Sequence, residues 1–218
     1  MVAIWSPTHI DIEIERVNEV LFLGVIPDDH LSWKSQIQNV ARKVSKSVGI
    51  YKSSFCLNKT SLCTLYCSLV YPYLHYRASA WGSIYQSNLK RLINLQKRVI
   101  RIVSRNSFDA HANPVFVSLW ILKFEDIIKL QIGKVMYLYK NGFLPDSFND
   151  MFLLNCDVHS YNTRSKNSIR LPYCRTNVRK FSLRFQRPKI FNSLSPEIQN
   201  ASSTALFNSK LKSFCFLV

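Results

Sequence analysis

A long stretch without a single carboxylate constrains this chain more than any other feature. From Leu31 to Arg105 there is no Asp or Glu, whereas Lys and Arg recur throughout. Apolar residues in the same stretch recur at the spacing of α-helices that bury one face, and the cations lie off that apolar face. The stretch therefore predicts a bundle of helices with a strongly basic outer surface.

Helix boundaries are also predicted. One helix runs from about Ser32, its N-cap, to Tyr51, and a second begins after Asn58 and ends or kinks at Pro72. A third starts at Asn88 or Ser87 and runs to about Arg105. Its inward positions are Leu89, Leu92, Ile93, Gln96, Val99, Ile100 and Val103. Later helices are expected over 124–141, with Gly142 just past the end, and after the cap Ser203.

The N-terminal region has strand patterns instead. Ile10, Ile12 and Ile14 alternate with acidic residues, and the apolar run Val20–Ile26 suits a buried strand in which Gly24 marks a bulge. A turn at 17–19 would pair the two strands as an antiparallel hairpin. Short strands are also expected at Ile169–Tyr173 and Phe181–Phe185.

These patterns predict a mainly α (α+β) fold with four segments. Residues 1–30 would form the hairpin, 31–106 a basic helical bundle, 107–155 a helical connector, and 156–218 a basic, mixed C-terminal region with short strands.

The charge balance indicates an anionic partner. The net charge is +16 and the pI is about 9.8, which favours nucleic acid first and an anionic membrane surface second. No apolar stretch reaches the ~20 residues of a membrane span, and the apolar faces of the basic helices are expected to pack in a core, so no membrane partner is expected. A solvated basic surface without a ligand is the alternative. The candidate phosphate-binding residues are Lys34, Arg42, Lys43, Lys46, Arg91, Lys97, Arg98, Arg101, Arg105 and Arg164.

Aromatic residues crowd the turn after Pro72 and leave two interpretations open. Tyr71, Tyr73, Tyr76 and Trp81 could stack on bases, or they could pack inside the bundle, which is the commoner role for such residues.

Catalytic chemistry is not indicated. Asp28-Asp29 follows Pro27 and suits a turn at a helix N-terminus better than a metal-binding pair. Among Cys156, His159 and Cys174, only Cys156 and His159 have zinc-type spacing, and a structural zinc site needs a second pair. Cys63 and Cys67 lie one helical turn apart, which favours packing in the core. No metal site, cofactor or catalytic residue is therefore assigned to this chain.

Several short motifs occur in a fixed order. Phe22-Leu23-Gly24-Val25 precedes two acidic residues and then Leu31-Ser32-Trp33-Lys34 and Ile37. Further along come Leu95–Arg98 with Arg101, Leu122–Ile127, His159–Arg164 and Lys189–Leu194. In this order they resemble the C-terminal part of reverse transcriptases from non-LTR (LINE-type, jockey-like) retrotransposons. Gln36 stands where that family usually has His.

The resemblance implies a fragment of an RNA-directed DNA polymerase. The Phe22–Val25 segment would be the primer-grip hairpin at the palm edge, 31–106 the thumb, and the ligand the RNA or DNA template–primer duplex. The Mg²⁺-binding aspartates would belong to an upstream palm, so this chain alone is expected to be inactive. The alternative is a stand-alone basic RNA-binding module without catalysis. Either would be intracellular, in the nucleus or the cytoplasm, since no secretory segment is recognised at the N-terminus.

Overall fold

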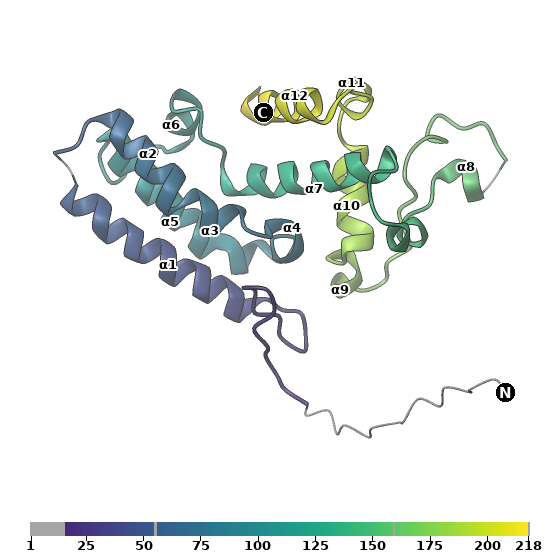
Figure 1. Cartoon of the computed structure of the whole chain (residues 1–218), viewed down its shortest axis with the longest axis horizontal. Coiled ribbons are helices and arrows are strands. Elements are labelled where there is room, and N and C mark those ends of the chain that lie inside the picture. Colours follow the sequence, from purple (N-terminus) through teal and green to yellow (C-terminus); the bar gives the residue numbers. More distant parts are fainter. Residues whose placement is uncertain (1–15, 55, 159, 218) are drawn as a thin grey trace, which may run out of the picture.

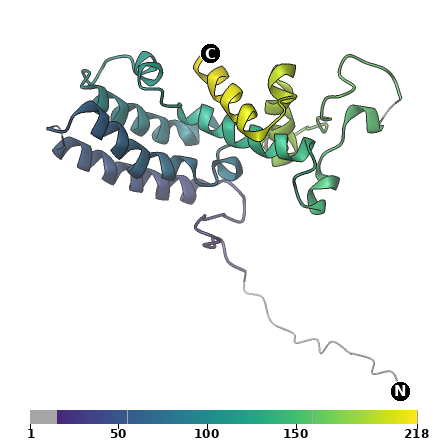
Figure 2. The same cartoon turned by 45° about the horizontal axis from the view of Figure 1, so that its top comes forward.

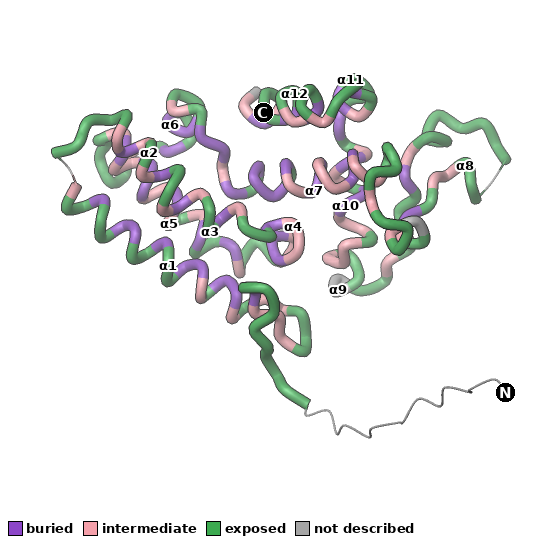
Figure 3. Tube along the Cα trace, viewed as in Figure 1, coloured by how far each residue is buried: buried purple, intermediate pink, exposed green. Residues whose placement is uncertain are grey.

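The computed structural model describes residues 16–54, 56–158 and 160–217, and in these ranges the fold is mainly α, as the sequence predicts. The first part is a helical bundle. Its long helices are α1 (Lys34–Ser53), α2 (Lys59–Leu69) and α5 (Gln86–Ser104), joined by the short helices α3 (Tyr71–His75) and α4 (Ala78–Trp81). α1 packs along α5, and their apolar stripes face each other in the core (Figures 1 and 3).

The predicted helix positions in the bundle are largely confirmed. α5 begins two residues before Asn88, and its expected inward residues are buried except Ile93, which is half-buried. Asn58 caps α2, because its side-chain oxygen accepts the backbone N–H of Ser61 at 2.8 Å. α1 begins at Lys34, and Ser32 does not cap it.

α7 (Phe124–Lys140) is the central element of the fold. It contacts α3, α4 and α5 of the bundle, and it also packs on α10 (Leu183–Asn192) and α12 (Thr204–Leu217). Most of its residues are buried for this reason (Figure 3). Gly142 follows its end with φ +70°, the left-handed conformation that glycine adopts without strain. The hydrophobic core therefore runs without a break from Val25 to Cys215.

Short helices complete the structure. They are α6 (Asn113–Ser118), η1 (Asp146–Met151), α8 (Asn155–Val158), α9 (Asn177–Lys180) and α11 (Pro196–Gln199). Figure 2 shows α8 and the loop after it at the opposite end of the molecule from α1 and α5. Ser203 caps the last helix as expected, since its hydroxyl accepts the backbone N–H of Leu206 at 3.2 Å. The four-segment division of the chain stays a prediction.

The strand predictions are not confirmed. Among the described residues there are only isolated bridges, which pair Glu19 with Asp28, Phe22 with Val25, and Leu154 with Ile169. The predicted strand over Phe181–Phe185 is wrong, because α10 begins at Leu183. The expected strand Ile10–Ile14, and with it one side of the predicted hairpin, lies outside the described residues.

The prediction of one buried strand over Val20–Ile26 is wrong. Leu23 and Gly24 both have positive φ, +48° and +77°, so the chain reverses at these two residues. Phe22 and Val25 then exchange backbone hydrogen bonds of 2.8 and 3.0 Å across the turn. Val25 is buried, but Leu21, Phe22 and Leu23 are exposed. The apolar run therefore forms the tip of a loop.

Candidate nucleic-acid interface

An open groove of about 620 Å³ follows the outer face of α5. Four of its residues are predicted phosphate-binding cations, and its full lining is Arg91, Asn94, Leu95, Lys97, Arg98, Arg101 and Phe108. The cations share this face because the opposite side of α5 is taken up by the buried stripe from Leu89 to Val103. The structure thus brings Arg91, Lys97, Arg98 and Arg101 together.

Among the described residues, three of these cations, Arg91, Lys97 and Arg98, have no hydrogen-bond or ion-pair partner. Lys97 and Arg98 are half-buried, so their side chains are partly held against the helix surface. The positive charges gathered in this groove repel each other, and an anion bound between them would offset that repulsion.

Arg101 has an additional structural role. Its Nε donates a 2.7 Å hydrogen bond to the carbonyl oxygen of Ala110, which holds the 107–110 turn beside α5. Asp109 on this turn is exposed. The Ser107 hydroxyl, and to a smaller extent the charge of Arg101, lower the pKa of its carboxyl. One carboxylate therefore lies next to the cationic groove.

The other predicted phosphate-binding residues lie elsewhere. Lys34, Arg42, Lys43 and Lys46 are exposed on α1, and none of them lines the α5 groove. Arg105 donates from Nη2 to the carbonyl oxygen of Leu57 at 3.0 Å, which ties the end of α5 to the loop before α2. Arg164 is exposed in the loop after α8. Figure 1 shows this loop at the far end of the molecule from α1 and α5.

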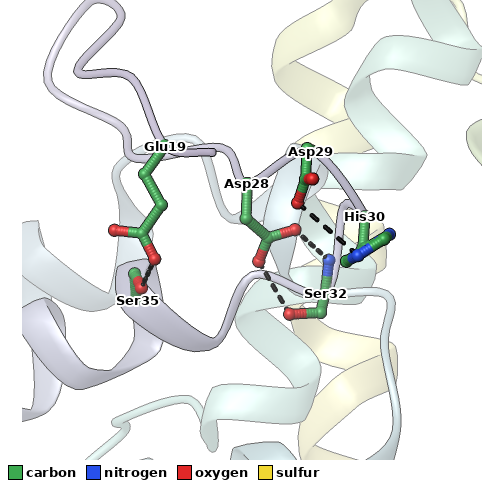
Figure 4. Close-up of polar contacts among 6 residues, drawn as sticks. All are labelled: Glu19, Asp28, Asp29, His30, Ser32 and Ser35. Carbon is green, nitrogen blue, oxygen red and sulfur yellow. Dashed lines mark hydrogen bonds and ion pairs between the residues drawn. The ribbon is translucent and has the colours of Figure 1, made fainter. Parts of the chain in front are cut away.

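The loop of residues 19–28, which contains the predicted primer-grip segment Phe22–Val25, lies against the start of α1. The buried Gln36 side chain accepts the backbone N–H of Ile26 at 3.1 Å, a contact that the sequence gave no sign of. Ser35 donates to the Glu19 carboxylate, and Ser32 donates to Asp28 at 2.7 Å from its hydroxyl (Figure 4). The loop is therefore fixed to α1 on both of its sides.

Asp28 has the structural role that the sequence indicated. Burial raises the pKa of its carboxyl, but hydrogen bonds from the Ser32 side chain and from the backbone N–H groups of residues 32–34 outweigh burial and leave that pKa below its ordinary value. The Oδ1 atom of Asp29 lies 3.8 Å from Nε2 of His30 (Figure 4). In the described ranges, no group of three or more His, Cys, Asp or Glu side chains is placed to hold a metal ion, and His159 lies outside them.

The aromatic residues divide between the two interpretations. Trp81 is fully buried, stacks on Phe124 and donates from Nε1 to the carbonyl oxygen of Tyr76 at 3.0 Å, so it belongs to the core. Tyr73 and Tyr76 are exposed, and cations lie over their rings: Lys43 is 5.3 Å from the Tyr73 centroid and Arg77 is 5.6 Å from that of Tyr76. Tyr71 is half-buried.

Tyr76 also positions the loop tip. Its hydroxyl donates to the carbonyl oxygen of Leu23 at 2.8 Å, the residue where the loop reverses. We expect Tyr76→Phe to speed hydrogen exchange of the Phe22 and Val25 amides several-fold, because one hydrogen bond contributes about 0.5–1.5 kcal/mol to local stability. Tyr73→Phe is the control, since its hydroxyl has no partner among the described residues. Equal exchange in both variants would contradict the assignment.

The sequence prediction missed three residues of the groove, Asn94, Leu95 and Phe108. Phe108 falls in the predicted 107–155 connector, yet it lines the groove with 78% of its surface exposed. The signal available in the sequence for Phe108 was its position, as an aromatic residue in a polar segment directly after a basic helix.

No helix built from the described residues has the length and hydropathy needed to cross a bilayer. A scan against protein-family models and searches of curated proteins and of solved structures found no match to this chain.

Proposed function

We propose that this chain binds nucleic acid through the α5 groove, as the part of a non-LTR retrotransposon reverse transcriptase that holds the template–primer duplex. The observation that supports binding most directly is the set of three cations, Arg91, Lys97 and Arg98, gathered in one groove without a partner among the described residues. In this proposal the metal-binding palm is a separate segment, this chain performs no catalytic step, and the protein acts in the nucleus or cytoplasm.

Phosphate is the anion that best fits such a groove. Arginine has a planar fork of donors that matches phosphate oxygens, and lysine adds a point charge. The groove is open, so a continuous backbone can pass along α5 without entering a closed pocket. Contacts of this kind fix position and orientation but do not read base sequence. We therefore expect similar affinity for unrelated sequences.

The loop tip supports the polymerase version of the proposal over a stand-alone RNA-binding module. Leu21, Phe22 and Leu23 are exposed by 71%, 62% and 58%, although the loop itself is hydrogen-bonded to α1 and to Tyr76. An ordered, exposed apolar tip favours contact with a surface outside this chain, such as a palm or a primer end. RNA binding by a stand-alone module does not require an exposed apolar tip of this kind.

Salt dependence tests the binding step. We expect the purified chain to bind a nucleic-acid duplex with an affinity that falls steeply with salt, because each neutralised phosphate releases condensed counterions. The slope of log affinity against log salt is about 0.9 per phosphate on B-DNA, which gives about 3 for three contacts. Fluorescence anisotropy on labelled DNA duplexes and RNA–DNA hybrids measures it. A slope near zero, or no binding at low salt, would refute the proposal.

A further inference from the structure

Phe108 is an apolar ring in an unusual place. Its side chain is 78% exposed, which forgoes the stabilisation of roughly 1.5–3 kcal/mol that burying a phenylalanine provides. It nevertheless lines the cationic groove together with Arg98 and Arg101. The ring is therefore available to a ligand at the same place where the cations are available to phosphates.

The position of Phe108 is set by the chain around it. The backbone N–H of Ala110 donates to the carbonyl oxygen of Ser107 at 3.2 Å, which closes the turn that contains Phe108. Arg101 donates to the carbonyl oxygen of Ala110, and the N–H of Asn106 donates to that of Arg101 at 3.0 Å. Both ends of the turn are thus hydrogen-bonded to α5 or to each other. Phe108 is consequently presented at a defined distance from the cations.

A charged groove with an exposed aromatic ring matches the chemistry of single-stranded nucleic-acid sites. In those sites cations follow the backbone while bases stack on aromatic side chains, and each stacked base contributes about 1–3 kcal/mol. In a duplex both faces of an internal base are covered by its neighbours, so a protein ring that does not unstack the duplex can stack only on a base that is unpaired or at a strand end. The groove volume of about 620 Å³ is within the range of roughly 300–1,000 Å³ that is usual for ligand sites.

We infer that the α5 groove takes an unpaired strand of nucleic acid, with its phosphates on Arg91, Lys97 and Arg98 and one base stacked on Phe108. This inference rests on the proposed function, since it assumes that the groove binds nucleic acid at all. It goes further by naming the part of the template–primer that lies in the groove: an unpaired segment of strand that continues from the duplex.

The test compares two ligands of the same sequence. Phe108→Ala is expected to lower affinity for a labelled single-stranded oligonucleotide by about 5- to 150-fold, which corresponds to one lost stacking contact. Affinity for a long blunt duplex, in which end bases are few, is expected to stay nearly unchanged. Phe108→Trp is expected to retain single-strand affinity. Phe143→Ala, which removes another exposed phenylalanine, should change neither. Circular dichroism confirms that each variant is folded.

The possible failures are distinguishable. If Phe108→Ala weakens single-strand and duplex binding equally, or weakens neither while the wild-type chain still binds duplex, the inference is wrong and the proposed function stands. If the wild-type chain binds neither ligand at low salt, both are wrong. A second readout is the fluorescence of a 2-aminopurine base in the oligonucleotide, which stacking on Phe108 should quench in the wild type but not in Phe108→Ala.

Discussion

Removing three groove cations together, as Arg91→Gln, Lys97→Gln and Arg98→Gln, is expected to lower affinity for nucleic acid by about 100-fold or more near 0.1 M salt, because three phosphate contacts are lost. The salt slope should fall by about 2.7 at the same time. Arg101 is left in place because its Nε holds the 107–110 turn, and its loss would alter the groove as well as the charge. Anisotropy titrations at several salt concentrations measure both quantities.

A matched variant separates the groove from the net charge. Arg42→Gln, Lys46→Gln and Lys52→Gln remove the same charge from exposed positions on α1, none of which lines the groove. Salt at this concentration screens exposed charges that do not contact the ligand directly, so the loss of affinity should be much smaller. Equal losses in the two variants would mean that binding depends on diffuse charge, and the α5 groove would have no special role.

The largest effect on stability is expected at Gln96. This side chain is buried in α5, donates from Nε2 to the Tyr66 hydroxyl at 2.8 Å and to the carbonyl oxygen of Leu122 at 3.0 Å, and accepts the N–H of Phe124 at 2.9 Å. It thereby joins α2 and α5 to the first residue of α7. Burial raises the pKa of Tyr66 far above its ordinary value, so this hydroxyl stays neutral and needs a partner.

Gln96→Leu is expected to lower the free energy of unfolding by about 3–5 kcal/mol. It keeps a similar volume but leaves three buried polar groups without partners, each at a cost of about 1–3 kcal/mol. Urea denaturation followed by circular dichroism measures the change. Gln38→Leu, at an exposed position of α1, is the control and should change stability by less than about 0.5 kcal/mol. A loss below about 1 kcal/mol at Gln96 would contradict this account of how α5 and α7 are joined.

The regular helices were predictable because their signals are local. The inward stripe of α5 repeats at helical spacing, and the caps Asn58 and Ser203 and the terminal Gly142 act within a few residues of themselves. The course of the chain through Val20–Ile26 could not be predicted in the same way. An apolar run does not reveal that the chain reverses at Leu23, where the Tyr76 hydroxyl, distant in the sequence, bonds to the Leu23 carbonyl oxygen.

The candidate site was predictable only in part. Charge and periodicity identified the cations of α1 and α5 alike, and nothing local distinguishes Arg98 from Arg42. The difference depends on which helix faces pack together and on the turn that brings Phe108 beside α5, held there by Arg101. For the same reason periodicity put Gln96 inside the bundle, but its partners in α2 and α7 depend on tertiary packing.

Lysine footprinting tests the central claim, that the α5 groove binds the nucleic-acid backbone. The folded chain is acetylated with and without a saturating oligonucleotide, and each modified lysine is quantified by mass spectrometry. The groove account predicts strong protection of Lys97, with Lys46 on α1 and Lys166 in the loop after α8 modified as in the free protein. Protection of Lys46 or Lys166 while Lys97 stays reactive would contradict it.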